Sequence, residues 1–200
     1  MDNPRDQPRR LVLASGSRYR KDLLGRLGLS FEVFSPSQVD ETPLAQEPPA
    51  DTALRLSVLK AKAAVQRHGD ALIIGSDQVA SSGGQRFDKP GTHENAVRQL
   101  RALSGRTAQF DTAVALLDAA SGQLESRLVP CRVTFRPLDE RLIQRYLEKE
   151  QPYDCAGAAK AEGLGIALIA RIDTEDPTSL IGLPLIALSE MLTRAGLPPV

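Results

Sequence analysis

The chain has 200 residues, 42% of them hydrophobic and 25% charged, and its acidic and basic side chains balance to zero net charge. This balance argues against a protein that holds nucleic acid through its phosphate backbone, and the apolar runs are too short to span a bilayer. The two cysteines are too few for a disulfide framework. We therefore expect a cytoplasmic globular protein without nucleic-acid or membrane partners.

Residues 1–10, MDNPRDQPRR, lack the apolar segment of a signal peptide. We expect them to form a flexible tail. A chain of this length suits one domain or two lobes that share a core, so residues 11–200 are expected to form a single domain of two lobes.

Residues 11–29 contain the first clear structural signal. The apolar or small residues 11–14 are typical of a buried strand, and the small polar turn 15–17 (SGS) follows them. Leucines then recur at helical spacing, and Gly28 stands where the helix is expected to end. The pattern predicts a strand, a loop lined by hydroxyl groups, and a helix.

Basic side chains gather at the start of this predicted helix. Arg18, Arg20 and Lys21 fall in its first turn, where the helix dipole is already positive. Each such cation costs up to about 0.3–1 kcal/mol of helix stability, and Asp22 offsets only part of this. Backbone amides, serine hydroxyls and guanidinium groups together bind anions, so the cluster favours an anion site. The alternative is a surface helix with solvated arginines.

A proline-rich stretch and a long helix follow. After a short strand at about 31–34, residues 35–49 read as a loop that holds Glu41. Asp51 is a good N-cap for a helix that runs to about residue 67. Lys60 lies inside this helix, where the more ordinary interpretation is a solvated lysine.

The apolar run 71–74 predicts a strand covered on both faces, and therefore a parallel one. Asp77 follows it, just past the expected carboxyl end, where open α/β sheets place their ligands. A carboxylate at this place could instead cap the next turn. Lys89 lies in the expected loop 87–91, and a single loop lysine is no evidence of function by itself.

The rest of the chain continues with both helices and strands. We expect a mixed twisted sheet with flanking helices, in two lobes around a central cleft, which is an α/β fold. The later elements are a helix capped by Thr92, an antiparallel pair at 107–117 and 124–135, a helix from about 139 to before Pro152, a strand at 166–172 and a helix from 185 closed by Gly196.

Small residues fill the stretch 154–163, around Lys160 and Glu162. Glycine and alanine at such density indicate that a backbone passes close to a ligand. The alternative is a tight buried turn whose charges point outward.

The charged candidates suggest phosphate chemistry. Cations at Arg20, Lys60 and Lys89 suit a polyphosphate, and the carboxylates of Glu41 and Asp77 suit a hard divalent ion, Mg²⁺ or Mn²⁺. Such an ion polarises a phosphoryl oxygen and helps to activate water. On this hypothesis Asp77 orients or deprotonates the attacking water.

The segment ASGSRYRKDLL, with Asp40-Glu41 downstream, resembles the signature of the Maf family of nucleotide pyrophosphatases, roughly ASxSPRRxxLL followed by DE. The similarity covers nearly the whole chain. It implies a fold similar to that of the inosine triphosphatases, cleavage of a nucleoside triphosphate to monophosphate and pyrophosphate, and a homodimer. The positions that match the family's site are Ser15, Ser17, Arg20, Glu41, Lys60, Asp77 as catalytic acid/base, and Lys89.

The chain departs from the family pattern at two positions. Arg18 replaces the usual proline, which alters the rigidity of the loop. Leu59 stands where many members have glutamate, so we assign position 59 no role.

Three other positions resemble the family branch that acts on 7-methyl-GTP, because Tyr19, Gln78 and Glu162 replace residues typical of the dTTP and UTP branch. A carboxylate at Glu162 can accept both N–H groups of a guanine edge. Tyr19 could stack on a purine, and a methylated guanine carries a positive charge that an aromatic face attracts. Tyr19 could instead be an ordinary half-buried aromatic, and Glu162 a surface residue.

The alternative functions are a dTTP/UTP pyrophosphatase and a nucleotide-binding regulator of cell division with little turnover.

Overall fold

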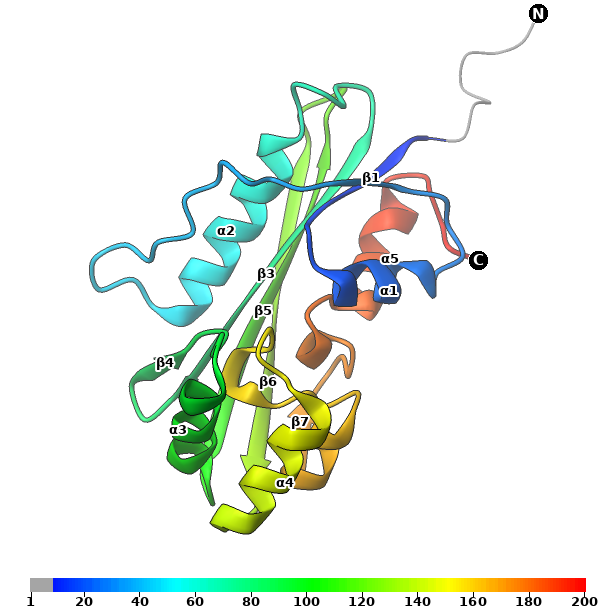
Figure 1. Cartoon of the computed structure of the whole chain (residues 1–200). Coiled ribbons are helices and arrows are strands. Elements are labelled where there is room, and N and C mark those ends of the chain that lie inside the picture. Colours follow the sequence, from blue (N-terminus) through cyan, green and yellow to red (C-terminus); the bar gives the residue numbers. More distant parts are fainter. Residues whose placement is uncertain (1–8) are drawn as a thin grey trace, which may run out of the picture.

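One mixed sheet organises the fold (Figure 1). The structure is a computed structural model that describes residues 9–200. Along the sheet the strands follow the order β2-β1-β3-β5-β6-β7, with β4 paired to β3. The β1 strand pairs in parallel with β2 and β3, and the other pairs are antiparallel. The strands are β1 Leu11–Ala14, β2 Glu32–Phe34, β3 Leu72–Ser82, β4 Gln85–Phe87, β5 Thr107–Asp118, β6 Leu124–Phe135 and β7 Ile169–Thr174.

Helices flank this sheet on both faces. In Figure 1, α2 lies on one side of the strands and α1 and α5 on the other, while α3 and α4 lie at the far end of β5 and β6. This arrangement confirms the predicted α/β fold with a mixed sheet and flanking helices. The helices are α1 Arg18–Gly25, α2 Pro49–Ala63, α3 His93–Leu103, α4 Glu140–Glu150 and α5 Leu185–Arg194, with short 3-10 helices η1 Ala156–Ala158, η2 Leu164–Leu168 and η3 Ser179–Ile181.

The alternation of side chains along β1 explains why the sheet is covered on both faces. Leu11 and Leu13 pack in a cluster with residues of α1 and α5, whereas Val12 and Ala14 pack with residues of α2. Successive residues of a strand point to opposite faces, so an unbroken apolar run requires cover on each side.

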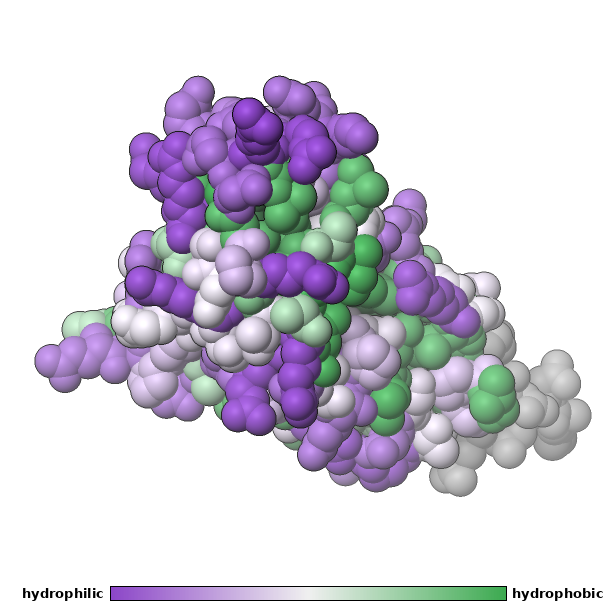
Figure 2. Space-filling model, turned by 90° about the horizontal axis from the view of Figure 1, so that it is seen from below, coloured by the Kyte–Doolittle hydropathy of each residue, from purple (hydrophilic) through white to green (hydrophobic). Residues whose placement is uncertain are grey.

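A further hydrophobic cluster lies at the other end of the long strands. It contains Phe110, Cys131 and Phe135 together with residues of α3 and α4. Cys131 is fully buried and packs there as a small core residue. Figure 2 views the molecule from this end, where hydrophilic side chains cover much of the surface and apolar ones show between them.

Gly75 brings α2 unusually close to the sheet. A Cβ atom at this position would lie 2.0 Å from the Ser57 carbonyl oxygen and 2.7 Å from the Ala61 backbone nitrogen. Only glycine fits under such a contact. Asp77 lies two residues further along β3 and therefore on the same face, so the contact at Gly75 sets the distance between Asp77 and α2.

Two predictions about β3 and α2 were wrong in detail. Asp77 lies inside the 11-residue β3 strand rather than beyond its end, because β3 continues in an antiparallel pair with β5 past the point where β1 stops at Ala14. The α2 helix begins at Pro49 and ends at Ala63, and Asp51 lies in its first turn. Proline at the first helical position replaces the expected side-chain cap.

The apolar segment predicted as a strand at 166–172 is divided between η2 and β7. Gly165 explains the 3-10 turn, because a Cβ atom there would lie 2.5 Å from the Lys160 carbonyl oxygen. The chain therefore folds back on the preceding loop before β7 starts at Ile169.

Most of the expected tail, residues 1–8, lies outside the described residues. Arg9 forms an ion pair with Asp118 at 2.7 Å, and Arg10 one with Glu32 at 2.8 Å. Among residues 9–200, no helix is both long and apolar enough to cross a membrane.

Candidate active site

A cavity of about 800 Å³ lies between the α1 and α2 sides of the sheet and the loop that follows α4. Every residue proposed for the site lines this cavity, although what each one does remains a prediction. They are Ser15, Ser17, Tyr19, Arg20, Glu41, Lys60, Asp77, Gln78, Lys89 and Glu162.

Lys60 lies between two carboxylates, one buried (Asp77) and one exposed (Glu41). Its Nζ lies 2.6 Å from Asp77 Oδ1 and 2.9 Å from Glu41 Oε1. The side chains of Lys60 and Asp77 are 6% and 10% exposed, so the interpretation of Lys60 as a solvated helix residue was wrong. Removing one partner from such a buried pair leaves an uncompensated charge, so Lys60 and Asp77 depend on one another, whereas the Glu41 side chain is 58% exposed.

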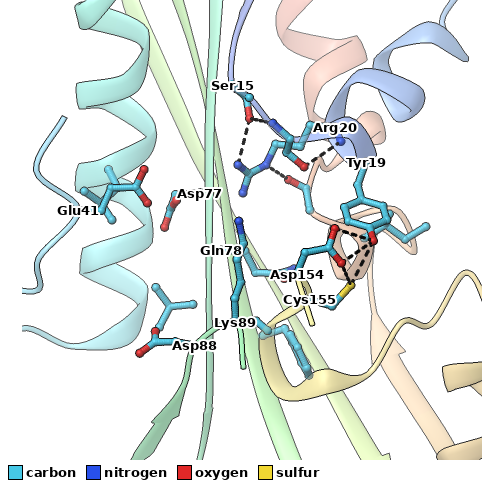
Figure 3. Close-up of a pocket in the computed structure, with 18 of the residues that line it drawn as sticks. Ser15, Tyr19, Arg20, Glu41, Asp77, Gln78, Asp88, Lys89, Asp154 and Cys155 are labelled. Atoms are coloured by element: carbon cyan, nitrogen blue, oxygen red, sulfur yellow. Dashed lines mark hydrogen bonds between the residues drawn. The ribbon is translucent and has the colours of Figure 1, made fainter. Parts of the chain in front are cut away.

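Arg20 is held at the opposite wall by backbone and side-chain contacts. Ser17 caps α1 by accepting from the Arg20 backbone N–H, and the Arg20 guanidinium donates to Ser15 Oγ at 3.3 Å (Figure 3). Its Nε donates to the Gly182 carbonyl oxygen at 2.8 Å. Burial lowers the pKa of Arg20, and the attraction of Asp77 and Glu41 opposes this, so the guanidinium faces the carboxylates.

The Gln78 side chain holds η3 against the sheet through hydrogen bonds. Its Nε2 lies within 2.9 Å of Thr112 Oγ1 and the Ser179 carbonyl oxygen, and 3.1 Å from the Leu180 carbonyl oxygen. The amide nitrogen therefore anchors η3 to the sheet. The amide oxygen is the part of Gln78 that a substrate contact could use.

The Tyr19 hydroxyl bridges the cavity. It donates to Asp154, with oxygens at 3.0 and 3.2 Å (Figure 3). It also accepts from an Arg18 nitrogen at 2.7 Å. Cys155 Sγ lies 3.5 Å from the same hydroxyl. Burial raises the pKa of Tyr19, so the group stays a neutral phenol that can donate. Tyr19 thus joins the start of α1 to the loop after α4.

The small-residue stretch 154–163 is fixed from behind by α4. Glu150 accepts from Lys160 Nζ at 2.6 Å and from the Leu164 backbone N–H at 2.7 Å. The hydrogen bond to Glu150 raises the pKa of Lys160. Lys160 therefore stabilises the loop from outside the cavity, whereas Glu162 lines the cavity and is exposed.

A family model described as Maf-like protein matches residues 10–195. The chain belongs to the Maf family. A 7-methyl-GTP pyrophosphatase of Thiobacillus denitrificans is 58% identical over 186 residues, which cover 93% of this chain and 92% of that protein. A 7-methyl-GTP pyrophosphatase of Cupriavidus pinatubonensis is 56% identical over 189 residues, covering 94% of each. The solved Staphylococcus aureus Ham1 protein aligns with a TM-score of 0.47 and 16% identity, over 64% of this chain and 73% of that one.

The Maf cavity offers few protein ligands for a metal ion. Within residues 9–200, no group of three or more His, Cys, Asp or Glu side chains is arranged to hold one. Glu41 and Asp77 instead share the Lys60 ammonium. Because Mg²⁺ is commonly bound by one or two carboxylates together with waters and substrate phosphates, this pair fits a divalent ion whose other ligands are phosphate oxygens.

Several residues that line the cavity or hold its walls carry no signal in the sequence of this Maf protein. Asp154 belongs to the small-residue stretch 154–163, but no local pattern marks it as the partner of Tyr19. Gly182 contributes a backbone carbonyl, which leaves no trace in the sequence. Arg86 lines the cavity and donates to Thr52 Oγ1 at 3.0 Å, a contact between segments 34 residues apart.

Proposed function

We propose that this Maf protein hydrolyses 7-methyl-GTP, or a related modified purine nucleotide, to the monophosphate and pyrophosphate. The observation that carries the proposal is the gathering of Arg20, Lys60 and Lys89 with Asp77 and Glu41 in one cavity. The cations suit a triphosphate, and the carboxylates suit a water nucleophile and a divalent ion. The relatives named 7-methyl-GTP pyrophosphatase support the choice of substrate.

In the proposed reaction a water molecule attacks the α-phosphorus, and the bond to the bridging oxygen breaks to release pyrophosphate. Asp77 orients this water or takes its proton. Arg20 and Lys89 offset the charge that develops on the phosphate oxygens. Glu41 and Asp77 would hold Mg²⁺ or Mn²⁺, which supplies polarisation of a phosphoryl oxygen when bound.

At the base end of the cavity, Glu162 would accept both N–H groups of the guanine edge. The Tyr19 ring would stack on the base, which a positive charge on methylated guanine favours. Gln78 would contact the substrate through its amide oxygen, because its nitrogen is engaged with η3.

A cytoplasmic homodimer remains part of the proposal. The C-terminal helix α5 gives it little support, because Leu188, Met191 and Leu192 pack in the chain's own core. On α5, Ile186 is the large apolar side chain that stays exposed, at 53%. A dimer would therefore need another surface as well.

Pyrophosphate release from 7-methyl-GTP, GTP, dTTP and UTP, with Mg²⁺ or Mn²⁺, tests the proposal. We expect many turnovers per protein molecule and a preference for 7-methyl-GTP. A preference for dTTP or UTP would assign the chain to the other pyrophosphatase branch. Tight nucleotide binding without turnover would favour the regulator of cell division, for which Asp77→Asn should leave the biological effect intact.

A further inference from the structure

We propose that Asp154 and Arg18 set the preference of the cavity for a positively charged base. Asp154 holds the Tyr19 ring in place and supplies a negative charge beside it, and Arg18 offsets part of that charge. This inference rests on the proposed function, because it explains how a methylated guanine, which is cationic, would be distinguished from guanine itself.

The contacts around Tyr19 form a closed triangle. The Tyr19 hydroxyl donates to Asp154 and accepts from Arg18, and Arg18 forms an ion pair with Asp154 at 3.3 Å. A phenol bonded to a carboxylate on one side and a guanidinium on the other has little freedom to rotate. Asp154 is therefore a positioning residue for the ring, which stands at the wall of the cavity.

The charges of this triangle face the place proposed for the base. Arg18, Tyr19, Asp154 and Glu162 all line the cavity. Asp154 and Glu162 both carry negative charge, which a cationic base favours over a neutral one. The Arg18 guanidinium lies 4.8 Å from the centre of the Tyr19 ring, so a planar cation already occupies a position over this aromatic ring.

Arg18 is also the residue that replaces the usual proline of the family signature. A proline at this position carries no charge and could form neither the ion pair with Asp154 nor the cation–π contact with Tyr19. The substitution therefore introduces a positive charge that competes with a cationic base for the same aromatic ring and the same carboxylate. Arg18 is 67% exposed in its side chain, so little packing opposes its displacement.

Equilibrium binding of 7-methyl-GMP and GMP measures the preference directly, because the two ligands differ only in the methyl group and its charge. The preference is the dissociation constant of GMP divided by that of 7-methyl-GMP. For Asp154→Asn, we expect this ratio to fall about two- to fivefold, which is the range for partly exposed charge pairs. For Arg18→Gln, we expect the same ratio to rise by a similar factor. If the two side chains only held the loop in place, both substitutions would change the ratio in the same direction.

Matched controls come from a second arginine–aspartate pair outside the cavity. Arg171 and Asp173 form an exposed ion pair at 2.5 Å on β7, and Arg171→Gln and Asp173→Asn should leave the ratio unchanged. Tyr19→Phe keeps the ring but removes the bond to Asp154, so its effect should not add fully to that of Asp154→Asn. Shifts of equal sign, or none, in the Asp154 and Arg18 variants would overturn the inference.

Binding of the monophosphates requires no turnover. A chain that fails to release pyrophosphate would contradict the proposed function, whereas an unchanged binding ratio in the variants would contradict the role of Asp154 and Arg18 alone. Thermal unfolding of each variant confirms that it is folded, and both side chains are at least half exposed, so folding is expected to tolerate the changes.

Discussion

The two ends of the cavity are built in different ways. At the end proposed for the phosphates, Lys60 and Asp77 are almost fully buried and belong to elements packed tightly through Gly75. At the end proposed for the base, the side chains of Arg18, at the start of α1, and of Asp154, in the loop after α4, are 67% and 50% exposed. Charges in the first region depend on the core, so changing them affects both chemistry and stability. Charges in the second region can change with little effect on the fold.

The largest effect is expected from Asp77→Asn at the phosphate end. The amide cannot take a proton from water, so kcat for pyrophosphate release should fall by at least about a hundredfold. Asp111→Asn is the control, because Asp111 is also buried on the sheet but lies outside the cavity lining. Steady-state kinetics on both variants distinguish loss of a catalytic carboxylate from loss of any buried one.

Gly75→Ala should break the packing that supports this end. The added methyl group would meet the α2 backbone, and we expect the free energy of unfolding to fall by about 3 kcal/mol. Gly25→Ala on α1 is the control, because a Cβ atom there meets nothing within 4 Å. Urea denaturation measures both. Equal stability of the two variants would show that α2 can move away from β3 at low cost.

Glu162→Gln tests the end of the cavity that is proposed to hold the base. The amide offers a single acceptor and no charge, so kcat/KM for 7-methyl-GTP should fall about tenfold relative to UTP, a loss of about 1.4 kcal/mol. Glu162 is exposed, so thermal stability should not change. A loss of stability equal to that of Gly75→Ala would contradict the difference between the two ends, because Glu162 would then also support the fold.

The smallest effect concerns pH and the loop that carries Glu41. Hydrogen bonds from Arg55 lower the pKa of Glu47 from 4.5 to about 2. A depressed pKa in the folded state stabilises the fold above the unfolded value, and this contribution is lost as the pH falls from about 4.5 towards 2. Glu47→Gln should therefore show a shallower acid dependence of unfolding in this window, measured by circular dichroism. An unchanged slope would contradict the role of the Glu47–Arg55 pair.

The sequence predicted local elements better than contacts between them. The strand, loop and helix at residues 11–25 follow from an apolar run, small polar residues and leucine spacing, and the antiparallel pair β5–β6 follows from alternation. Lys60 was misjudged because a lysine in a helix usually faces water. Its burial depends on Asp77, which is 17 residues away, and on the absence of a side chain at Gly75.

Residues that line the cavity were predictable by type where charge was unusual for its surroundings. The cations in the first turn of α1 and the carboxylate on an apolar strand stood out against their neighbours. Asp154 did not, because a polar residue in a loop is ordinary and its partner Tyr19 lies 135 positions earlier in the chain. Only the fold brings the two together.

The bridge made by Tyr19 also equips the molecule with an optical reporter. The chain has three tyrosines and no tryptophan, so phenol emission is not masked by indole. Tyr146 is buried, and its hydroxyl donates a hydrogen bond to the Ala158 carbonyl oxygen. The Tyr153 hydroxyl is hydrogen-bonded to His93, and Tyr19 is the tyrosine that lines the cavity. We therefore expect a ligand bound in the cavity to change the emission of Tyr19, without any label.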